Sequence, residues 1–246
     1  MKNKIKSLPS GEIIDGTKKL SVGHSIYEFW LKEYRGVDPQ TGSALYTFND
    51  ADKSIKWNDK TCFERDGERF TTDQALAQYH YAGSAIPKVY GGINTNLRFK
   101  NFEFGAVFTY QLGGKTYNSS YLSLMSVNSF GQALHTDILN RWQKPGDITD
   151  VPRLDAGQST NFNAQSDRWL FSSDCFNIKS LSLGYNLPKS FVSKFTLQNA
   201  RLSFSGENIY SFTALKGMNP QQQFNGLSNN AYLPSRTFTF SLNVTL

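Results

Sequence analysis

The sequence lacks any run of about 18 apolar residues, the length at which a stretch becomes a candidate membrane helix. Its basic start, residues 1–10, is not followed by the apolar core of about seven residues that a secretory signal requires. We therefore expect the chain to be part of a larger protein, with a natural start upstream of Met1.

Side chains for metal or covalent chemistry are also scarce. The chain has two cysteines and three histidines, and none of them has the CxxC or HxxxH spacing of a metal or redox site. Cys62 and Cys175 could pair in an oxidising compartment, and their spacing does not decide whether they do. Residues 12–15 and 147–150 offer paired carboxylates, but both lie in predicted loops. We therefore predict no enzyme, no catalytic residue, no metal and no cofactor.

Acidic residues are fewer than basic ones. The formal net charge is +6, from 26 Lys and Arg against 20 Asp and Glu. A basic surface can bind nucleic acid when its charges gather on one element. Here the charges are scattered, and they are densest at residues 2–6 and 18–19. We expect them to lie in solvated loops, and we predict no nucleic-acid partner.

Aromatic residues are abundant although the chain is polar on average. There are 19 Phe and 12 Tyr, and the mean hydropathy is −0.46. Such a chain places its apolar residues at alternating positions, as residues 236–246 do without interruption. A tilted strand of this length would project to roughly 28 Å, close to the apolar band of about 25 Å of an outer-membrane barrel.

The alternation predicts seven strands and a short stub. The stub is residues 2–8, and the strands are residues 25–37, 44–48, 88–100, 102–112, 174–186, 198–211 and 236–246. The phase of alternation slips within residues 174–186, which predicts a bulge near Lys179 and Ser180. A four-residue apolar repeat predicts one amphipathic helix at residues 132–142.

The predicted connections alternate in length. Those after Val37, Lys100 and Asn186 are short, whereas residues 49–87, 113–171 and 212–233 form long loops. Outer-membrane barrels have short periplasmic turns and long extracellular loops. The predicted fold class is therefore all-β, an antiparallel transmembrane β-barrel segment of about seven or eight strands.

Ten short motifs occur in order along nearly the whole chain. They are residues 27–30 (YEFW), 34–42 (YRGVDPQTG), 83–88 (GSAIPK), 90–94 (YGGIN), 108–115 (FTYQLGGK), 139–142 (LNRW), 149–154 (TDVPRL), 183–188 (LGYNLP), 215–218 (LKGM) and 234–238 (PSRTF). Together they resemble the C-terminal barrel region of the SusC/RagA family of TonB-linked outer-membrane proteins. The sequence departs from the family pattern at Asn219, where Asp is frequent, and at Leu246, where outer-membrane barrels usually end in an aromatic residue.

The resemblance implies a place in the cell outer membrane and a role in nutrient import. Members look like large single-chain barrels, a size that suits a 22-stranded wall, with a plug domain inside. They import glycan or peptide fragments with energy from TonB, and they pair with a SusD-like surface lipoprotein. Residues 1–246 would be barrel, without the plug or signal peptide, and TonB would act through the missing N-terminal part.

Two sets of aromatic and apolar residues follow from this interpretation. We expect a lipid-facing set at Phe102, Phe104, Phe108, Tyr110, Phe238, Phe240, Leu242, Val244 and Leu246. The extracellular loops would offer a second set for a ligand or for the lipoprotein lid, namely Tyr117, Tyr121, Trp142 and Trp169.

Two alternatives remain at this point. The stub could serve as an eighth strand and close a small, self-contained outer-membrane barrel. The strands could instead form a secreted carbohydrate-binding β-sandwich, whose apolar faces would pack against each other. If the chain is one arc of a larger wall, its open edges predict that these 246 residues alone do not transport.

Overall fold

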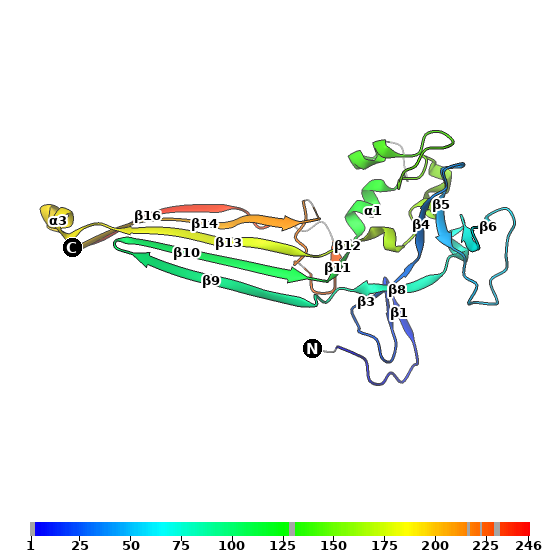
Figure 1. Cartoon of the computed structure of the whole chain (residues 1–246), viewed down its shortest axis with the longest axis horizontal. Coiled ribbons are helices and arrows are strands. Elements are labelled where there is room, and N and C mark those ends of the chain that lie inside the picture. The colour runs from blue at the N-terminus through cyan, green and yellow to red at the C-terminus, as the bar shows by residue number, and fades with distance from the viewer. Residues whose placement is uncertain (1–2, 128–130, 216, 222, 229–231) are drawn as a thin grey trace. The chain divides into compact units, whose positions relative to one another are not determined.

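The computed structural model describes residues 3–127, 131–215, 217–221, 223–228 and 232–246 (Figure 1). Two compact units share the chain. The first, which we call the loop unit, combines described residues of 1–85, 115–171 and 223–230. The second, the sheet unit, combines those of 86–114, 172–222 and 231–246. The sequence analysis treated the chain as one barrel region and did not anticipate this division.

The sheet unit is built on one antiparallel sheet of five strands. Their order across the sheet is β16-β14-β13-β10-β9. The strands are β9 (Val89–Phe99), β10 (Phe102–Leu112), β13 (Cys175–Asn186), β14 (Asn199–Thr213) and β16 (Thr237–Thr245). These bounds lie within two residues of the predicted ones, because period-two alternation runs along each strand. Five long strands share the sheet, fewer than the seven or eight expected.

The pairing register collects the apolar side chains on one face. Phe104 pairs with Leu97 on one side and Leu183 on the other, and the row continues through Phe204 to Phe240. Successive side chains of a strand point to opposite faces, so serine, threonine, asparagine and charged residues occupy the other face. Exposure of the apolar row ranges from 38% for Phe104 to 71% for Phe240. The sheet therefore has an uncovered apolar face.

The predicted bulge is confirmed. Ser180 pairs with Val107 and Ile178 pairs with Phe108, which leaves Lys179 as the extra residue. On the other side of β13, the ladder to β14 shifts at the same level, between Ile178 and Ser180. The extra residue restores one apolar face along the whole strand.

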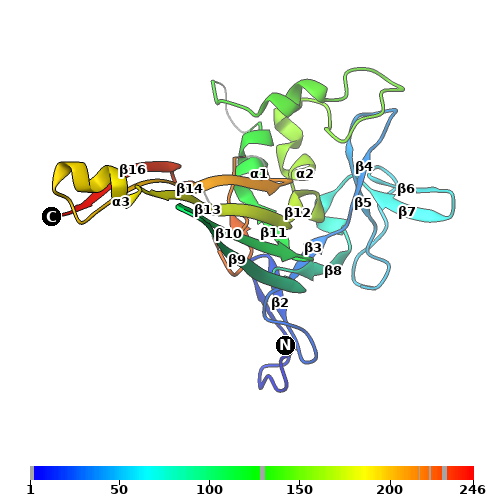
Figure 2. The ribbon, with the colours of Figure 1, turned by 60° about the vertical axis from the view of Figure 1, so that its left-hand side comes forward.

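The connection between β13 and β14 contains short helices that the sequence analysis did not predict. Pro188 precedes α3 (Lys189–Val192), which passes directly into the 3-10 helix η5 (Ser193–Phe195). Figures 1 and 2 both place α3 at the same end of the sheet as the end of β16.

The loop unit contains three smaller sheets. Their strand orders are β1-β2-β3-β8, β4-β5-β7-β6 and β12-β11-β15. The first sheet comprises β1 (Ile13–Asp15), β2 (Lys18–Leu20), β3 (Glu28–Lys32) and β8 (Tyr79–Ser84). The second comprises β4 (Tyr34–Val37), β5 (Ala44–Thr47), β6 (Cys62–Arg65) and β7 (Glu68–Thr71). The third comprises β11 (Lys115–Asn118), β12 (Leu170–Ser172) and β15 (Leu227–Ser228).

The predicted strand at residues 25–37 is two strands in different sheets. Its backbone changes partner at Glu33, whose N–H donates to the carbonyl of Gln78 and whose carbonyl accepts from the N–H of Thr47. No Gly, Pro, Asn or Asp occurs between residues 25 and 35, so no turn residue in the sequence marks the change. The short strand predicted at residues 2–8 is also wrong. The structure describes residues 3–8 of it, and they contain no strand.

The predicted loop at residues 49–87 contains three strands and the 3-10 helix η1 (Gln74–Leu76). The hairpin of β6 and β7 turns at Asp66 and Gly67, with φ of 54° and 79°. Two adjacent positive φ values suit an Asp-Gly turn of the hairpin type. This dipeptide was the signal that the sequence analysis missed.

The predicted helix at residues 132–142 is wrong. Only the 3-10 helix η2 (Thr136–Asn140) forms there, and it ends because the N–H of Trp142 bonds to the carbonyl of Val151 instead of continuing the helix. An α-helix forms earlier in the same long connection. It is α1 (Ser119–Met125), and the side chain of Asn118 caps its first turn. The remaining helices are η3 (Ala156–Gln158), α2 (Ser159–Phe162) and η4 (Asp167–Trp169).

Two buried clusters form the core of the loop unit. The larger contains Phe29, Leu31, Tyr117, Met125 and Trp169. A smaller one surrounds β5 and α2 and includes Ala44, Tyr46 and Phe162. Among the described residues, no helix is long and apolar enough to cross a membrane.

Candidate functional site

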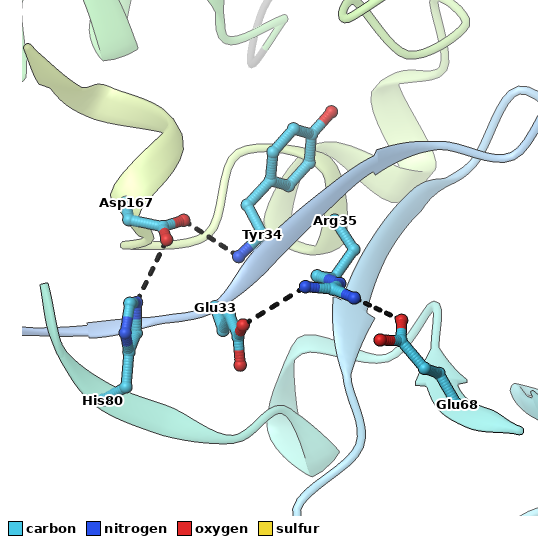
Figure 3. A network of polar contacts seen from close by, with 6 residues as sticks. All are labelled: Glu33, Tyr34, Arg35, Glu68, His80 and Asp167. Carbon is cyan, nitrogen blue, oxygen red and sulfur yellow. Dashed lines mark hydrogen bonds and ion pairs between the residues drawn. The ribbon is translucent and has the colours of Figure 1, made fainter.

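A polar network joins three parts of the loop unit that lie far apart in the sequence (Figure 3). The imidazole Nε2 of His80 lies 3.0 Å from Oδ2 of Asp167, and Oδ1 of Asp167 accepts from the N–H of Tyr34 at 2.9 Å. The hydrogen bond with Asp167 raises the pKa of His80 above its ordinary value, although burial opposes the shift. This carboxylate therefore holds η4 against both β4 and β8.

Arg35 extends the network along β4. Its guanidinium lies 3.4 Å from Glu33 and forms a second ion pair with Glu68 on β7 (Figure 3). Burial raises the pKa of the neighbouring Tyr34 to about 12, and its hydroxyl donates to the carbonyl of Asp150 at 3.0 Å. Every member has a structural partner, and in the described part of the chain no three His, Cys, Asp or Glu side chains gather as metal ligands would. The network therefore ties β4, β7, β8 and η4 together.

The predicted turn at residues 38–42 is present and is held from two directions. Asp38 is 5% exposed, and its carboxylate accepts from Thr41 and from the guanidinium of Arg65 at 3.0 Å. Burial alone would raise the pKa of Asp38, but these hydrogen bonds lower it. The guanidinium of Arg153 donates to the carbonyl of Thr41, and the indole of Trp142 donates to the carbonyl of Pro39.

The four aromatic residues expected to contact a ligand lie inside the loop unit. Trp169 and Tyr117 are 0% and 4% exposed, so the surrounding core covers both rings. The Trp169 indole donates to the carbonyl of Ala164 at 2.9 Å. Tyr121 and Trp142 are half-buried, and the Tyr121 hydroxyl donates to Asp137 at 2.8 Å. Ligand contact by Tyr117 or Trp169 would require these side chains to leave the core.

A row of aromatic side chains on β3 and β8 was not expected from the sequence. The rings of Trp30 and Tyr79 are stacked with centroids 6.1 Å apart, and Tyr81 meets Trp30 edge-on at 4.8 Å. The ring of His24 stacks on Tyr81 at 3.8 Å, and Lys19 lies 4.3 Å from the centre of Trp30. Partly exposed rings of this kind offer flat apolar surface with polar edges. The alternation of Tyr79 and Tyr81 was the available signal, but it lay in a segment assigned to loop.

The expected lipid-facing residues of the sheet unit share one face. The register aligns Phe102 with Leu202 through Tyr185, and Leu202 with Leu242. The same face carries Phe104, Phe108, Tyr110, Phe238, Phe240 and Val244. Leu246 follows the last residue of β16 and is 86% exposed.

The opposite face of the sheet unit is polar and carries a compact charge cluster. Glu103 forms ion pairs with Arg98 and with Arg201, and it accepts from the amide of Asn186 at 3.3 Å. Arg98, Glu103 and Arg201 border a hollow of about 490 Å³ whose lining also includes glycines and serines. Cys62, in the loop unit, and Cys175, in the sheet unit, are both buried free thiols.

No protein-family model matches the chain. The chain is 31% identical over 271 residues to TonB-dependent receptor P3 of Formosa agariphila, an alignment that covers 99% of this chain and 25% of P3. The chain belongs to the TonB-dependent receptors. TonB-dependent receptor P26 of the same organism is 25% identical over 281 residues, covering 99% of this chain and 26% of P26. This receptor chain therefore spans about a quarter of the length of the curated relatives that it matches.

Solved structures of the RagAB peptide transporter share the fold. One matches 98% of this receptor chain with a TM-score of 0.73 at 24% identity, and the match covers 24% of that chain. A second, the RagAB peptide importer in its open-open state, matches 99% with a TM-score of 0.74 at 22% identity and covers 25% of that chain. The prediction from the ten motifs that the chain comes from a TonB-dependent receptor is confirmed.

Proposed function

We propose that this chain forms barrel wall and extracellular loops of an outer-membrane TonB-dependent nutrient importer. The uncovered apolar face of the sheet unit carries the proposal. Its residues, exposed by 38% at Phe104 and 71% at Phe240, would be costly in water but are the surface that a lipid bilayer covers. The polar face, with Glu103 and its two arginines, would then line the lumen.

The connectivity supports an assignment of sides. The segments of the loop unit join the sheet at the start of β9, the end of β10 and the start of β13, and between β14 and β16. In an antiparallel sheet these points all lie at one end. The other end has the β9–β10 turn at Lys100 and Asn101 and the connection through α3. Long extracellular loops and short periplasmic turns are the pattern of outer-membrane barrels.

Partners and substrate follow as further parts of the proposal. TonB would act through regions of the full receptor outside this chain, and a SusD-like lipoprotein would cover the loop unit. The imported substrate would be an oligosaccharide or a peptide, and the peptide transport named for RagAB supports the second class. Among the expected ligand contacts, Tyr121 and Trp142 are better placed than the two buried rings, and the row of Trp30, Tyr79 and Tyr81 joins them.

The experiment is import by the full-length receptor in its own cells. A strain lacking the receptor gene is supplied with oligosaccharides or with short peptides, with and without a plasmid copy of the gene. We expect the receptor in the outer-membrane fraction and restored uptake of one substrate class, dependent on TonB. Equal uptake of every substrate in both strains would contradict the proposal.

Neither the small closed barrel nor the β-sandwich fits the fold better than the wall of a larger barrel does. In a closed small barrel the first and last strands pair, but in the described sheet β9 and β16 are the two edges. A sandwich would cover the apolar face, and Phe238, Phe240 and Leu242 are 59% to 71% exposed. The wall of a larger barrel satisfies both observations.

A further inference from the structure

A groove of about 580 Å³ lies along one edge of the sheet unit. Its walls are the bulge region of β13, the last residues of β14, and the segments 217–219 and 233–236. The volume falls within the range of about 300 to 1,000 Å³ that is usual for small-molecule sites. The comparisons and the sequence motifs assign nothing to it.

The groove exists because the sheet changes its pairing at this level. The ladder between β14 and β16 ends with the pair Glu207 and Thr237, whereas β14 continues to Thr213. Directly after that pair, Asn208 has a φ of 51°, and its amide donates to the carbonyl of Ser235 at 3.2 Å. The irregularity at Asn208 thus lies where β14 stops pairing with β16. Bulges are frequent beside binding sites.

The charged residues that line the groove are both cations. They are Lys179, the extra residue of the β13 bulge, and Arg236, which precedes β16. Neither forms an ion pair with any carboxylate of the described residues, in contrast to Arg98 and Arg201, which share Glu103. Among the described lining residues there are two cations without an ion pair and no acid, which gives the groove a positive potential that attracts anions.

The rest of the lining is suited to a small organic ligand. Tyr210, Phe212 and Leu215 supply apolar surface, and the Arg236 guanidinium lies 6.0 Å from the centre of the Tyr210 ring. Asn177 lies beside them, held in place by its hydrogen bonds to Thr109 and Gln221. An arginine presents its donors in a planar fork that matches a carboxylate or a phosphate.

We propose that this groove binds the carboxylate or phosphate group of a small ligand through Lys179 and Arg236, with the ligand body against Tyr210 and Leu215. Two sources supply this chemistry: an acidic substrate on its way to import, or a phosphorylated lipid of the outer membrane. The groove stands on its own geometry, and only its first ligand source rests on the proposed import.

The test uses the purified full-length receptor in lipid nanodiscs and two anionic probes. The soluble probe is trigalacturonate, compared with the neutral trisaccharide maltotriose. The lipid probe is lipid A in phosphatidylcholine discs, compared with discs of phosphatidylcholine alone. Dissociation constants are measured by titration calorimetry for trigalacturonate and by native mass spectrometry for lipid A.

The decisive variant is K179Q/R236Q, which removes both charges. We expect it to weaken binding of the anionic probe by about tenfold or more, and salt to weaken wild-type binding in the same direction. The conservative variant K179R/R236K keeps both charges and should keep binding, which separates loss of charge from loss of folding. The matched control K189Q/K194Q removes two exposed charges of α3 and η5 outside the groove and should change nothing.

The outcomes identify the source or reject the site. Charge-dependent binding of trigalacturonate supports a soluble acidic ligand, and charge-dependent binding of lipid A alone supports a membrane lipid. The proposal is overturned if neither anionic probe binds better than its neutral counterpart. It is also overturned if K179Q/R236Q binds as tightly as K189Q/K194Q.

Discussion

Gly42 and Trp142 show how one residue can depend on another a hundred positions away. Gly42 has a φ of 69°, a left-handed conformation, and a Cβ added there would collide with the six-membered ring of Trp142. The indole is fixed over the turn by its hydrogen bond to the carbonyl of Pro39. Trp142 was expected to contact a ligand, but its position also makes it the support of this turn.

Gly42→Ala should open the turn at residues 38–43. Left-handed backbone costs a non-glycine residue about 1–2 kcal/mol, and the collision with Trp142 adds to this. Hydrogen exchange of residues 38–48 in the full-length receptor measures the loss. Gly16→Ala is the matched control, because Gly16 has a φ of 56° with nothing within 4 Å of an added Cβ. Equal effects of the two substitutions, each on its own turn, would show that the ring contact contributes nothing.

His80 gives the loop unit a pH dependence of known sign. Its pKa is raised above the ordinary value, first by the hydrogen bond with Asp167 and also by the charges of Asp167 and Glu33. A raised pKa means that the contact stabilises fully below the unfolded pKa of about 6.5 and is lost as pH rises through the folded value. We therefore expect lower protection factors for β8 and η4 at pH 9 than at pH 6, once the exchange rates are corrected for the intrinsic pH dependence of amide exchange.

The pH effect should be small, under about 1 kcal/mol, because both side chains are partly exposed to solvent. His80→Gln should remove most of it while leaving the exchange of the sheet unit unchanged. A pH dependence that persists in His80→Gln would assign the effect to another group.

Within β16, adjacent residues have opposite surroundings. Leu242 lies on the apolar face and is 59% exposed, whereas Ser241 lies on the polar face. In a bilayer, Leu242→Arg should cost about 2–4 kcal/mol near the midplane, and Ser241→Arg on the lumen side should cost little. The measurement is the amount of folded full-length receptor in the outer membrane for each variant. Equal loss from both substitutions would mean that the apolar face does not meet lipid.

The elements differ in how far the sequence predicts them. β10 is found at its predicted bounds, and Lys179 is the predicted bulge, because alternation alone specifies a strand with one apolar face. β3 and β4 were predicted as one strand because no turn residue lies between them, and only tertiary pairing at Glu33 separates them. Helix α1 was missed because its short apolar pattern is completed by packing against Trp169 rather than by its own sequence.

The expected site residues depend on tertiary packing to different degrees. The lipid-facing set depends only on strand parity, and the register places it on one face. Exposure of a loop aromatic depends on which segment packs over it. Trp169 is buried because residues 115–171 fold back onto β3, which no local pattern in the sequence specifies.

At the scale of the whole molecule, the sheet unit has two open edges, at β9 and β16. Unpaired backbone groups in lipid cost several kcal/mol each, so the wall needs further strands on both sides. We propose that the 246-residue chain alone gives no saturable substrate uptake in liposomes, whereas the full-length receptor does. Saturable uptake by the isolated chain would mean that it closes by itself.

Residues 34–41 are held by hydrogen bonds to residues that come much later in the sequence. The hydrogen bonds from Tyr34 to Asp150, from Trp142 to Pro39 and from Arg153 to Thr41 span 116, 103 and 112 residues. During synthesis and export, residues 28–48 therefore emerge well before the segment that completes their core. Phe29 and Leu31, both 0% exposed in the finished fold, stay uncovered until that segment arrives, and exposed apolar side chains of this kind make a partly folded chain prone to aggregation.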